Sequence, residues 1–316
     1  MIPPKFNFLI LYARFVRLFT FYLPPILSQK FRNLFFPIRW FKKLDFLFGV
    51  RCVTGSLFFA PSFDYHAYKF FFHGYFDWRV LATAIACSPA KGDIVEVGAN
   101  IGTETVGFSD IVNGKGTVYA FEPLERNVSV IKSWLARSGV ENVKLYPLAV
   151  GEKSGTASFC LPPERFLSGV GFVMIENEDA AISVDVVPLD DYVERFKRIF
   201  LLAIDVEGYE LFVLKGAGKL IAQCRPVILL ECDPHHMSRS GYTAEDIICF
   251  FADNKYEIWE IGKLGLQKPS RYTQDKFSNW VCFPSEKSIE LTNRVDRILF
   301  RSGIFPVLRK LNPLRL

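Results

Sequence analysis

The feature that most constrains this chain is a regular alternation of short apolar runs and amphipathic helical patterns, which starts near residue 77. Apolar runs of strand length stand at 93–97, 117–121, 143–150, 200–206, 226–231, 256–261 and 280–283. Helical patterns occupy 77–87, 103–110, 125–138, 209–215 and 244–254, and a further helix opens at 189–193. Strands that alternate with helices form a parallel sheet covered on both faces, so the pattern predicts a doubly wound α/β fold.

A polar stretch rich in Gly and Pro interrupts this alternation between residues 151 and 188. It carries two shorter strand candidates, 155–161 and 182–187. We therefore expect a small β insertion in the α/β domain, because short apolar runs bounded by turn residues are typical of strands.

Composition excludes several other classes of protein. Half of the 316 residues are hydrophobic and the net charge is +5, which excludes a mainly disordered chain. So small a net charge over this length gives little support for nucleic-acid binding, and no nucleic-acid partner is expected. The seven cysteines are odd in number and none has C-x-x-C spacing, which argues against a disulfide framework and a structural zinc site. Reduced thiols indicate a cytoplasmic protein.

The charge is distributed unevenly along the chain. Residues 1–50 carry net +7 and residues 287–316 net +5, which leaves net −7 for the 236 residues between them. Phenylalanine is also uneven, since 18 of the 32 lie in residues 1–76. We therefore divide the chain into a basic, Phe-rich extension (1–76), an α/β domain (77–285) and a basic tail (286–316).

Two interpretations of the N-terminal extension stay open. Its apolar stretches are too short for a membrane span, because Arg14, Arg17 and the pair Pro24-Pro25 interrupt them. Bases interleaved with Phe and Trp are typical of a segment that lies on an anionic membrane, here on the inner face and through residues 1–50. Alternatively, the aromatic residues pack on the domain as a helical layer. The tail carries a second, weaker basic amphipathic pattern between Val295 and Ile304.

The loop that follows the first apolar run is the strongest functional signal. Glu96, Gly98, Asn100 and Gly102 alternate in it with other residues. Open α/β sheets bind ligands outside the carboxyl ends of their strands, and glycine lets the backbone approach the ligand. A nicotinamide-binding loop has the pattern G-x-G-x-x-G, but here Asn100 stands where the second Gly would be. Glu122, at the tip of the next strand, is placed to accept the hydroxyl groups of a ribose.

These residues, with others further along, resemble the FkbM-type S-adenosylmethionine-dependent methyltransferases. The resemblance covers roughly residues 93–261 and rests on seven ordered blocks. The blocks are Val95–Gly102, Val118–Pro123, Leu148–Gly151, Pro188–Asp190, Ile204–Glu210, Val213–Ala217 and Arg225–Glu231. One position departs from the pattern, since Ala203 stands where the family often has Lys. If that lysine helps catalysis in relatives, this protein does without it.

The resemblance implies the fold, the cofactor and the residues that hold it. The implied fold is the seven-stranded, Rossmann-like methyltransferase sheet, and the implied cofactor is S-adenosylmethionine. Outside the resemblance, we expect helical extensions at both ends. The methionine part of the cofactor would lie against Glu96, Gly98, Ala99, Asn100 and Gly102. Glu122 would hold the ribose hydroxyls and Ala149 would lie near the adenine. Asp205 would face the sulfonium or the acceptor.

Chemistry limits the candidates for the catalytic residues. The sulfonium methyl is already activated, so the enzyme mainly has to align it with the nucleophile. An alcohol has a high pKa and needs a positioned base. The candidate bases are Asp205, Glu207, Glu231 and His235, with His236 as a neighbouring alternative. A metal ion at Asp205, Glu207 and a histidine is the less favoured arrangement, and no metal is expected.

The sequence therefore predicts an O-methyltransferase that acts on a hydroxyl of a sugar, in a surface glycan or glycolipid. The sugar rests on the resemblance and on the membrane-like N-terminus, not on any single residue. Two alternatives remain: a nicotinamide-dependent oxidoreductase of the doubly wound class, and a non-catalytic, membrane-associated binding module on this scaffold.

Overall fold

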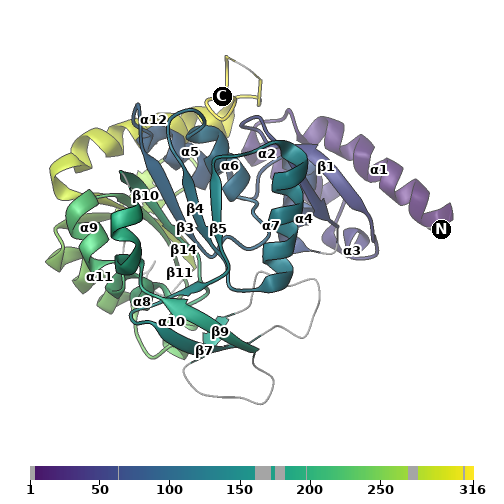
Figure 1. Cartoon of the computed structure of the whole chain (residues 1–316). Helices are drawn as coiled ribbons and strands as arrows, with labels where there is room; N and C mark the ends of the chain where they lie inside the picture. The colour runs from purple at the N-terminus through teal and green to yellow at the C-terminus, as the bar shows by residue number, and fades with distance from the viewer. Residues whose placement is uncertain are drawn as a thin grey trace.

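The computed structural model describes residues 4–62, 64–160, 172–174, 182–196, 198–269, 277–308 and 310–316. Its centre is a twisted sheet in the strand order β13-β12-β14-β11-β10-β3-β4-β5 (Figure 1). The strands are β3 (Asp93–Val97), β4 (Val118–Phe121), β5 (Val143–Tyr146), β10 (Ile199–Ile204), β11 (Val227–Cys232), β12 (Tyr256–Ile261), β13 (Leu266–Gln267) and β14 (Ser278–Pro284). The seven predicted strands are present, and the two-residue β13 adds an eighth at the edge.

The pairing pattern defines where a ligand can bind. β10, β3, β4 and β5 run parallel, as do β10 and β11, whereas β14 is antiparallel to both β11 and β12. The chain leaves β3 toward β4 and β5, and then returns to the other side of β3 to form β10. This reversal of strand order is a topological switch point, and it opens a crevice at the carboxyl ends of β3 and β10.

Helices cover both faces of the sheet because each strand buries alternate side chains on opposite faces. Ile94, Val118 and Leu201 belong to the hydrophobic cluster on one face, and their neighbours Val95 and Tyr119 belong to the cluster on the other. The helices of the first face are α5 (Trp78–Cys87), α6 (Thr105–Ile111), α7 (Glu125–Ser138) and α12 (Ser288–Ile304). Those of the second are α8 (Glu210–Lys215), α9 (Gly218–Cys224), α10 (Pro234–Arg239) and α11 (Ala244–Asp253).

The predicted β insertion is a separate four-stranded sheet in the order β6-β9-β7-β8. Its strands are β6 (Ala149–Val150), β7 (Gly155–Cys160), β8 (Phe172–Met174) and β9 (Ile182–Val187). Residue 161, the last of the predicted strand 155–161, lies outside the described residues. The strand predicted at 143–150 is present only as far as Tyr146, so its predicted end is wrong. Pro147 cannot donate a ladder hydrogen bond, so the chain leaves the main sheet after Tyr146, and Ala149 and Val150 pair with β9.

One predicted helix differs in type. Several elements of the structure were not predicted. Residues 189–195 form a 3₁₀ helix, η2 (Leu189–Arg195), and the short η3 spans Ser285–Lys287. α9, α10 and β13 lie in stretches that carry no strong periodicity. Among the described cysteine side chains, six are free thiols. Within the described residues, none of the helices has both the length and the apolar character that crossing a lipid bilayer requires.

The N-terminal extension packs on the first face of the sheet. It comprises α1 (Pro4–Thr20), α2 (Pro25–Phe35), α3 (Ile38–Phe41), the hairpin of β1 (Leu47–Arg51) and β2 (Leu57–Pro61), and α4 (Tyr65–His73). Pro25 begins α2 and Pro37 precedes α3, where proline is tolerated because the first helical N–H groups have no partner. Phe36, Phe41 and Phe72 are fully buried in the same hydrophobic cluster as the sheet. The packing interpretation therefore holds for one side of these helices.

Candidate active site

The loop after β3 has a backbone shape that only certain residues allow. Gly98 and Gly102 have φ of 87° and 88°, and Asn100 has φ of 51°. A Cβ at Gly98 would collide with the carbonyl oxygen of Asp205, the residue that follows β10. The N–H groups of Gly98 and Ala99 both donate to the carbonyl of Phe121, at 3.0 Å. Glycine therefore lets the loop fold tightly between the ends of β4 and β10.

The carboxylate of Glu122 holds this loop in place through hydrogen bonds. Its Oε2 accepts the N–H of Asn100 at 2.8 Å, and its Oε1 accepts the N–H of Leu124 at 2.9 Å and the side-chain amide of Asn127 at 3.2 Å. Burial raises the pKa of Glu122 to about 7, although these donors oppose the shift. A carboxylate has about four acceptor sites, so roughly one is left for a ligand hydroxyl.

The crevice at the switch point holds two adjoining cavities. The first is lined by the loop after β3, the tip of β4, Leu148–Val150 and Tyr209. Among the predicted cofactor residues, this cavity is lined by Gly98, Asn100, Glu122, Ala149 and Asp205. Glu96 and Ala99 line the second cavity instead. Gly102 lines neither: a Cβ there would meet the Trp134 ring at 2.6 Å, so this glycine serves the packing of α7 against the loop.

The second cavity has a volume of about 380 Å³, which is within the range of small-molecule sites. One wall comes from the N-terminal extension through Tyr65, His66 and Lys69 of α4 and through Phe76. The sheet contributes Glu96 from β3, Glu231 from β11 and Asn279 from β14. The two cavities share Gly98, Asn100, Asp205, Glu207 and His66, so they join at the carboxyl end of β10.

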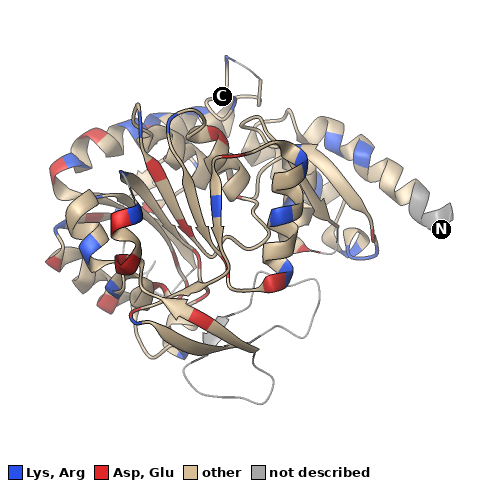
Figure 2. Cartoon of the chain, viewed as in Figure 1, with Lys and Arg blue, Asp and Glu red and all other residues tan. Residues whose placement is uncertain are grey.

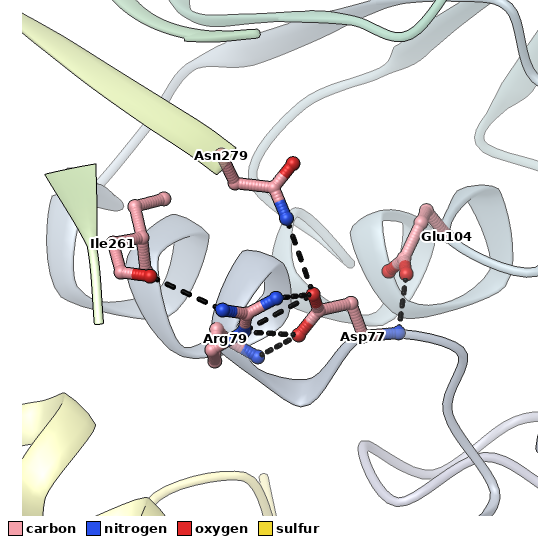
Figure 3. A network of polar contacts seen from close by, with 5 residues as sticks. All are labelled: Asp77, Arg79, Glu104, Ile261 and Asn279. Atoms are coloured by element: carbon pink, nitrogen blue, oxygen red, sulfur yellow. Dashed lines mark hydrogen bonds and ion pairs between the residues drawn. The ribbon is translucent and has the colours of Figure 1, made fainter. Parts of the chain in front are cut away.

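A polar network forms another wall of the second cavity (Figure 3). Asp77, the N-cap of α5, makes an ion pair with Arg79 at 2.5 Å. Arg79 also donates to the carbonyl of Ile261 at 3.1 Å, and Asn279 donates to Asp77 at 3.4 Å. The backbone N–H of Asp77 donates to Glu104 at 2.9 Å. The network thus ties α5 to β12, to β14 and to the loop before α6.

Carboxyl groups dominate the junction of the two cavities. Burial raises the pKa of Glu96 to about 8, with a further contribution from Asp205 and Glu122. Burial also raises the pKa of Asp205 and of Glu231, and the neighbouring Glu207 raises both further. Burial likewise raises the pKa of Glu104. The junction therefore holds several carboxyl groups whose charges repel one another, and a cation would relieve that repulsion.

The two candidate histidines have different surroundings. His235 is exposed and lines neither cavity, so the structure places this predicted base away from the other candidates. His236 lies one helical step further on α10, and its Nδ1 is 2.8 Å from Oε2 of Glu207. The hydrogen bond to Glu207 raises the pKa of His236. Asp233 caps α10 by accepting the N–H groups of both histidines and so fixes the direction of the helix.

Glu207, Glu231 and His236 could also hold a metal ion. Each offers one ligand atom, and these atoms lie within 4.8 Å of one another. Carboxylate and imidazole ligands suit several divalent cations. The sequence favoured no metal here, and it named Asp205 rather than Glu231 as the second carboxylate of the less favoured metal site.

Several residues of the second cavity were not predicted. His66, Lys69, Asp77, Arg79, Glu104 and Asn279 lie outside the blocks on which the sequence prediction rested, although Glu104 follows the first block by two residues. Asp77 carries a sequence signal, since it begins the helical pattern at 77–87 and Asp is favoured as an N-cap. His66 and Lys69 come to the site on α4, and Asn279 comes on β14. Arg79 and Glu104 lie near the starts of α5 and α6, and no motif in the sequence marks them.

Comparison with known proteins matches part of this chain to a methyltransferase family. The family model described as the Methyltransferase FkbM domain matches residues 96–258. Methyltransferase 1 of Beauveria bassiana is 26% identical over 154 residues, which are 42% of this chain and 61% of that protein. The chain therefore spans less than two thirds of this curated relative.

Solved structures show weaker similarity. The FkbM methyltransferase of Methylobacillus flagellatus has 20% identity and a TM-score of 0.42, over 61% of this chain and 44% of its own. SMU.1697c of Streptococcus mutans, solved in complex with SAH, has 10% identity and a TM-score of 0.39, over 65% of this chain and 94% of its own.

Proposed function

Because the chain belongs to the FkbM methyltransferase family, we propose that it transfers the methyl group of S-adenosylmethionine to a hydroxyl of a sugar, in a surface glycan or glycolipid. Family membership confirms the predicted class of enzyme and its cofactor. The acceptor, the oxygen nucleophile and the residues that act on them are the content of the proposal.

The observation that carries the proposal is the junction of the two cavities at Asp205. The first cavity adjoins Glu122 and the loop after β3, and it would take the cofactor. The second would take the acceptor. A methyl donor in one and a hydroxyl in the other would meet beside Asp205 and Glu207, and methyl transfer requires this in-line approach. Gly98, Asn100, Glu122 and Ala149 are the residues we assign to the cofactor.

The lining of the second cavity supports a sugar as the acceptor. The rings of Tyr65 and Phe277 offer apolar surfaces for the C–H faces of a sugar, whereas His66 and Lys69 contact the ring of Phe76. The carboxyl oxygens of Glu96 and Glu231 can accept hydrogen bonds from its hydroxyl groups. Mixed aromatic and carboxyl walls suit a ligand that has both kinds of surface.

We assign the base to the carboxyl groups at the junction. Asp205 lines both cavities, and its raised pKa makes it a stronger base than an ordinary carboxylate. Glu207 also lines both, Glu231 lines the acceptor cavity, and His236 would act through Glu207 as a positioning residue. Lys69 brings an ammonium group to this cavity from α4, with its Nζ 4.0 Å from the Phe76 ring centroid. β10 itself offers no ammonium group at position 203, where Ala203 replaces the lysine that the family often has.

The two alternatives differ from this proposal in measurable ways. A nicotinamide-dependent oxidoreductase would bind NAD or NADP, whereas family membership favours SAH, and a titration of both ligands separates the two. A non-catalytic binding module would bind SAH without turnover. No observation on the described residues favours either alternative.

The test of the function is a transfer assay with methyl-labelled S-adenosylmethionine. The purified full chain is incubated with glycans and glycolipids from a host strain that lacks the gene, and labelled products are mapped by mass spectrometry. We expect one methyl increment on a sugar hydroxyl and none in the gene-intact material, which is already methylated. Label that appears only on nitrogen, or on protein alone, contradicts the proposed acceptor.

The preference for S-adenosylmethionine over SAH is expected to rise with pH. The methyl donor carries a sulfonium cation, and SAH is its neutral thioether. Burial raises the pKa of Glu96 to about 8, so this group is protonated and neutral at pH 6.5 and anionic at pH 9. The cation is attracted only to the anionic form. We therefore expect the ratio of the two affinities to increase about three- to tenfold between pH 6.5 and 9, measured by calorimetry. A constant ratio contradicts this electrostatic account, since the two ligands share every other charge.

A further inference from the structure

The first helix exposes an apolar stripe on the side that does not pack. Phe8, Leu11, Phe15 and Leu18 recur at the spacing of one helical face, and all four side chains are exposed, as is Tyr22 just after the helix ends. Phe8 is 72% exposed and Leu11 64%. The opposite side of α1 is buried through Ala13, Val16 and Thr20. This helix is therefore fastened to the protein by one face and presents large apolar side chains to the outside with the other.

The C-terminal tail lies against the residues that directly follow this helix. The N–H of Val307 donates to the carbonyl of Tyr22 at 3.0 Å, and the guanidinium of Arg315 lies 4.9 Å from the Phe21 ring centroid. The neighbouring apolar side chains on α2 and on the tail are also exposed: Leu27, Leu34, Phe35, Phe300, Ile304, Phe305, Leu308, Leu311 and Leu316. We call α1, α2 and residues 300–316 the terminal surface.

The terminal surface is basic and lacks carboxylates. Residues 1–44 and 297–316 contain no Asp or Glu. Figure 2 shows the blue bands of Lys and Arg on α1, with no red among them. The two basic ends of the sequence thus come together, although about 280 residues separate them.

A pocket with three arginines opens in this surface. It is lined by Arg17, Arg51 and Arg315, with Leu18 and Tyr22 at its apolar side. Among the described residues, the partners of these guanidinium groups are neutral. They are the carbonyl of Phe71 for Arg17, the carbonyl of Gly55 for Arg51, and the ring of Phe21 for Arg17 and Arg315. Three positive charges without a carboxylate in the pocket fit a phosphate group, which accepts several guanidinium N–H groups at once.

We propose that the terminal surface docks on an anionic membrane, with the arginine pocket binding the phosphate of a lipid headgroup. The apolar stripe favours a lipid surface over a free anion, because Leu18 and Tyr22 at the pocket would enter the acyl region as the phosphate binds. Aromatic and aliphatic side chains interleaved with bases are the composition of segments that lie in the membrane interface. The proposal is independent of the acceptor in the second cavity.

The experiment is co-sedimentation of the full chain with two kinds of vesicle. One is phosphatidylcholine alone, and the other is phosphatidylcholine with about 30% of the anionic lipid phosphatidylglycerol. We expect binding to the anionic vesicles that weakens as salt is raised. The double variant Arg51→Gln/Arg315→Gln should bind roughly 30-fold more weakly, because each base near an anionic surface contributes about fivefold. The triple variant Phe8→Ser/Leu11→Ser/Phe15→Ser should also lose binding.

Matched controls separate this result from general effects of charge and hydrophobicity. Lys153→Gln/Arg198→Gln removes two exposed charges outside the terminal surface, and Ile289→Ser removes an 82% exposed apolar side chain from the start of α12. Both should bind vesicles like the unchanged chain. SAH affinity, measured for every variant, reports whether the domain is still folded.

Three outcomes would overturn the proposal. The first is that Arg51→Gln/Arg315→Gln binds anionic vesicles as tightly as the control Lys153→Gln/Arg198→Gln. The second is a change of oligomeric state in the triple variant with no effect on vesicle binding, which would make the stripe an interface between two copies of the chain. The third is thermal stabilisation by inorganic phosphate that depends on Arg51 and Arg315, without vesicle binding, which would make the pocket a site for a free anion.

Discussion

Asp205→Asn is expected to lower kcat by about 10²- to 10⁴-fold, the contribution usually made by a positioned base. The side chain lies where the two cavities join, and Asn keeps its shape while removing its ability to take a proton. Burial and the neighbouring Glu207 raise the pKa of Asp205, so the carboxylate has a high affinity for the hydroxyl proton. SAH affinity should change much less than kcat, because the lost interaction belongs to the reacting acceptor.

The measurement is the steady-state rate of methyl transfer together with SAH affinity. Asp253→Asn, an exposed carboxylate at the end of α11, is the matched control and should keep full activity. Glu207→Gln provides the comparison within the site. If Glu207→Gln is the more damaging change and Asp205→Asn retains activity, the base is Glu207, with His236 as its positioning residue. Loss of SAH binding with an unchanged kcat would assign Asp205 to the cofactor alone.

Gly98→Ala is expected to destabilise the protein by more than about 4 kcal/mol and to abolish SAH binding. Two costs add at this position. The backbone has φ of 87°, which disfavours any residue with a Cβ, and that Cβ would collide with the carbonyl oxygen of Asp205. Relief of the collision has to separate the loop after β3 from the end of β10, which are the two edges of the cofactor cavity.

Gly114→Ala is the control that isolates the collision. Gly114 also has positive φ, at 67°, but a Cβ there meets no atom within 4 Å. It should cost only about 1–2 kcal/mol and leave SAH binding intact. Urea unfolding of the two variants measures the difference. Equal destabilisation would mean that the loop moves freely away from β10, and the proposed cofactor site would then lack its rigid edge.

The fold could be predicted to a large extent because its signal is local. Helix α7 and strands β9 and β12 have the predicted bounds, since hydrophobic periodicity and flanking turn residues decide them. The strand at 143–150 failed because its apolar run continues across Pro147, and proline decides the pairing where hydrophobicity does not. Helix α10 has a readable beginning in Asp233-Pro234, an N-cap followed by proline at the first helical position, but too few residues for a periodic pattern.

The site was predictable only where its residues share a strand or the loop after it. Gly98, Asn100, Glu122 and Asp205 follow strand ends, so the topology alone brings them together. The choice between His235 and His236 depends on the orientation of α10, because consecutive residues of a helix point in different directions. Lys69 reaches the acceptor cavity through the packing of α4 on the sheet, and no pattern in the sequence relates position 69 to position 231.

The placement of α4 limits what family membership says about the acceptor of this protein. The wall that Tyr65, His66 and Lys69 give to the acceptor cavity lies upstream of residues 96–258, the part that the family shares. Under the proposed function, the shared stretch supplies the donor site and the upstream helix supplies part of the acceptor site. Two members could agree at every position of the common stretch and still modify different molecules. Ancestry therefore indicates what this protein donates, and the upstream helix is the place to look for what it accepts.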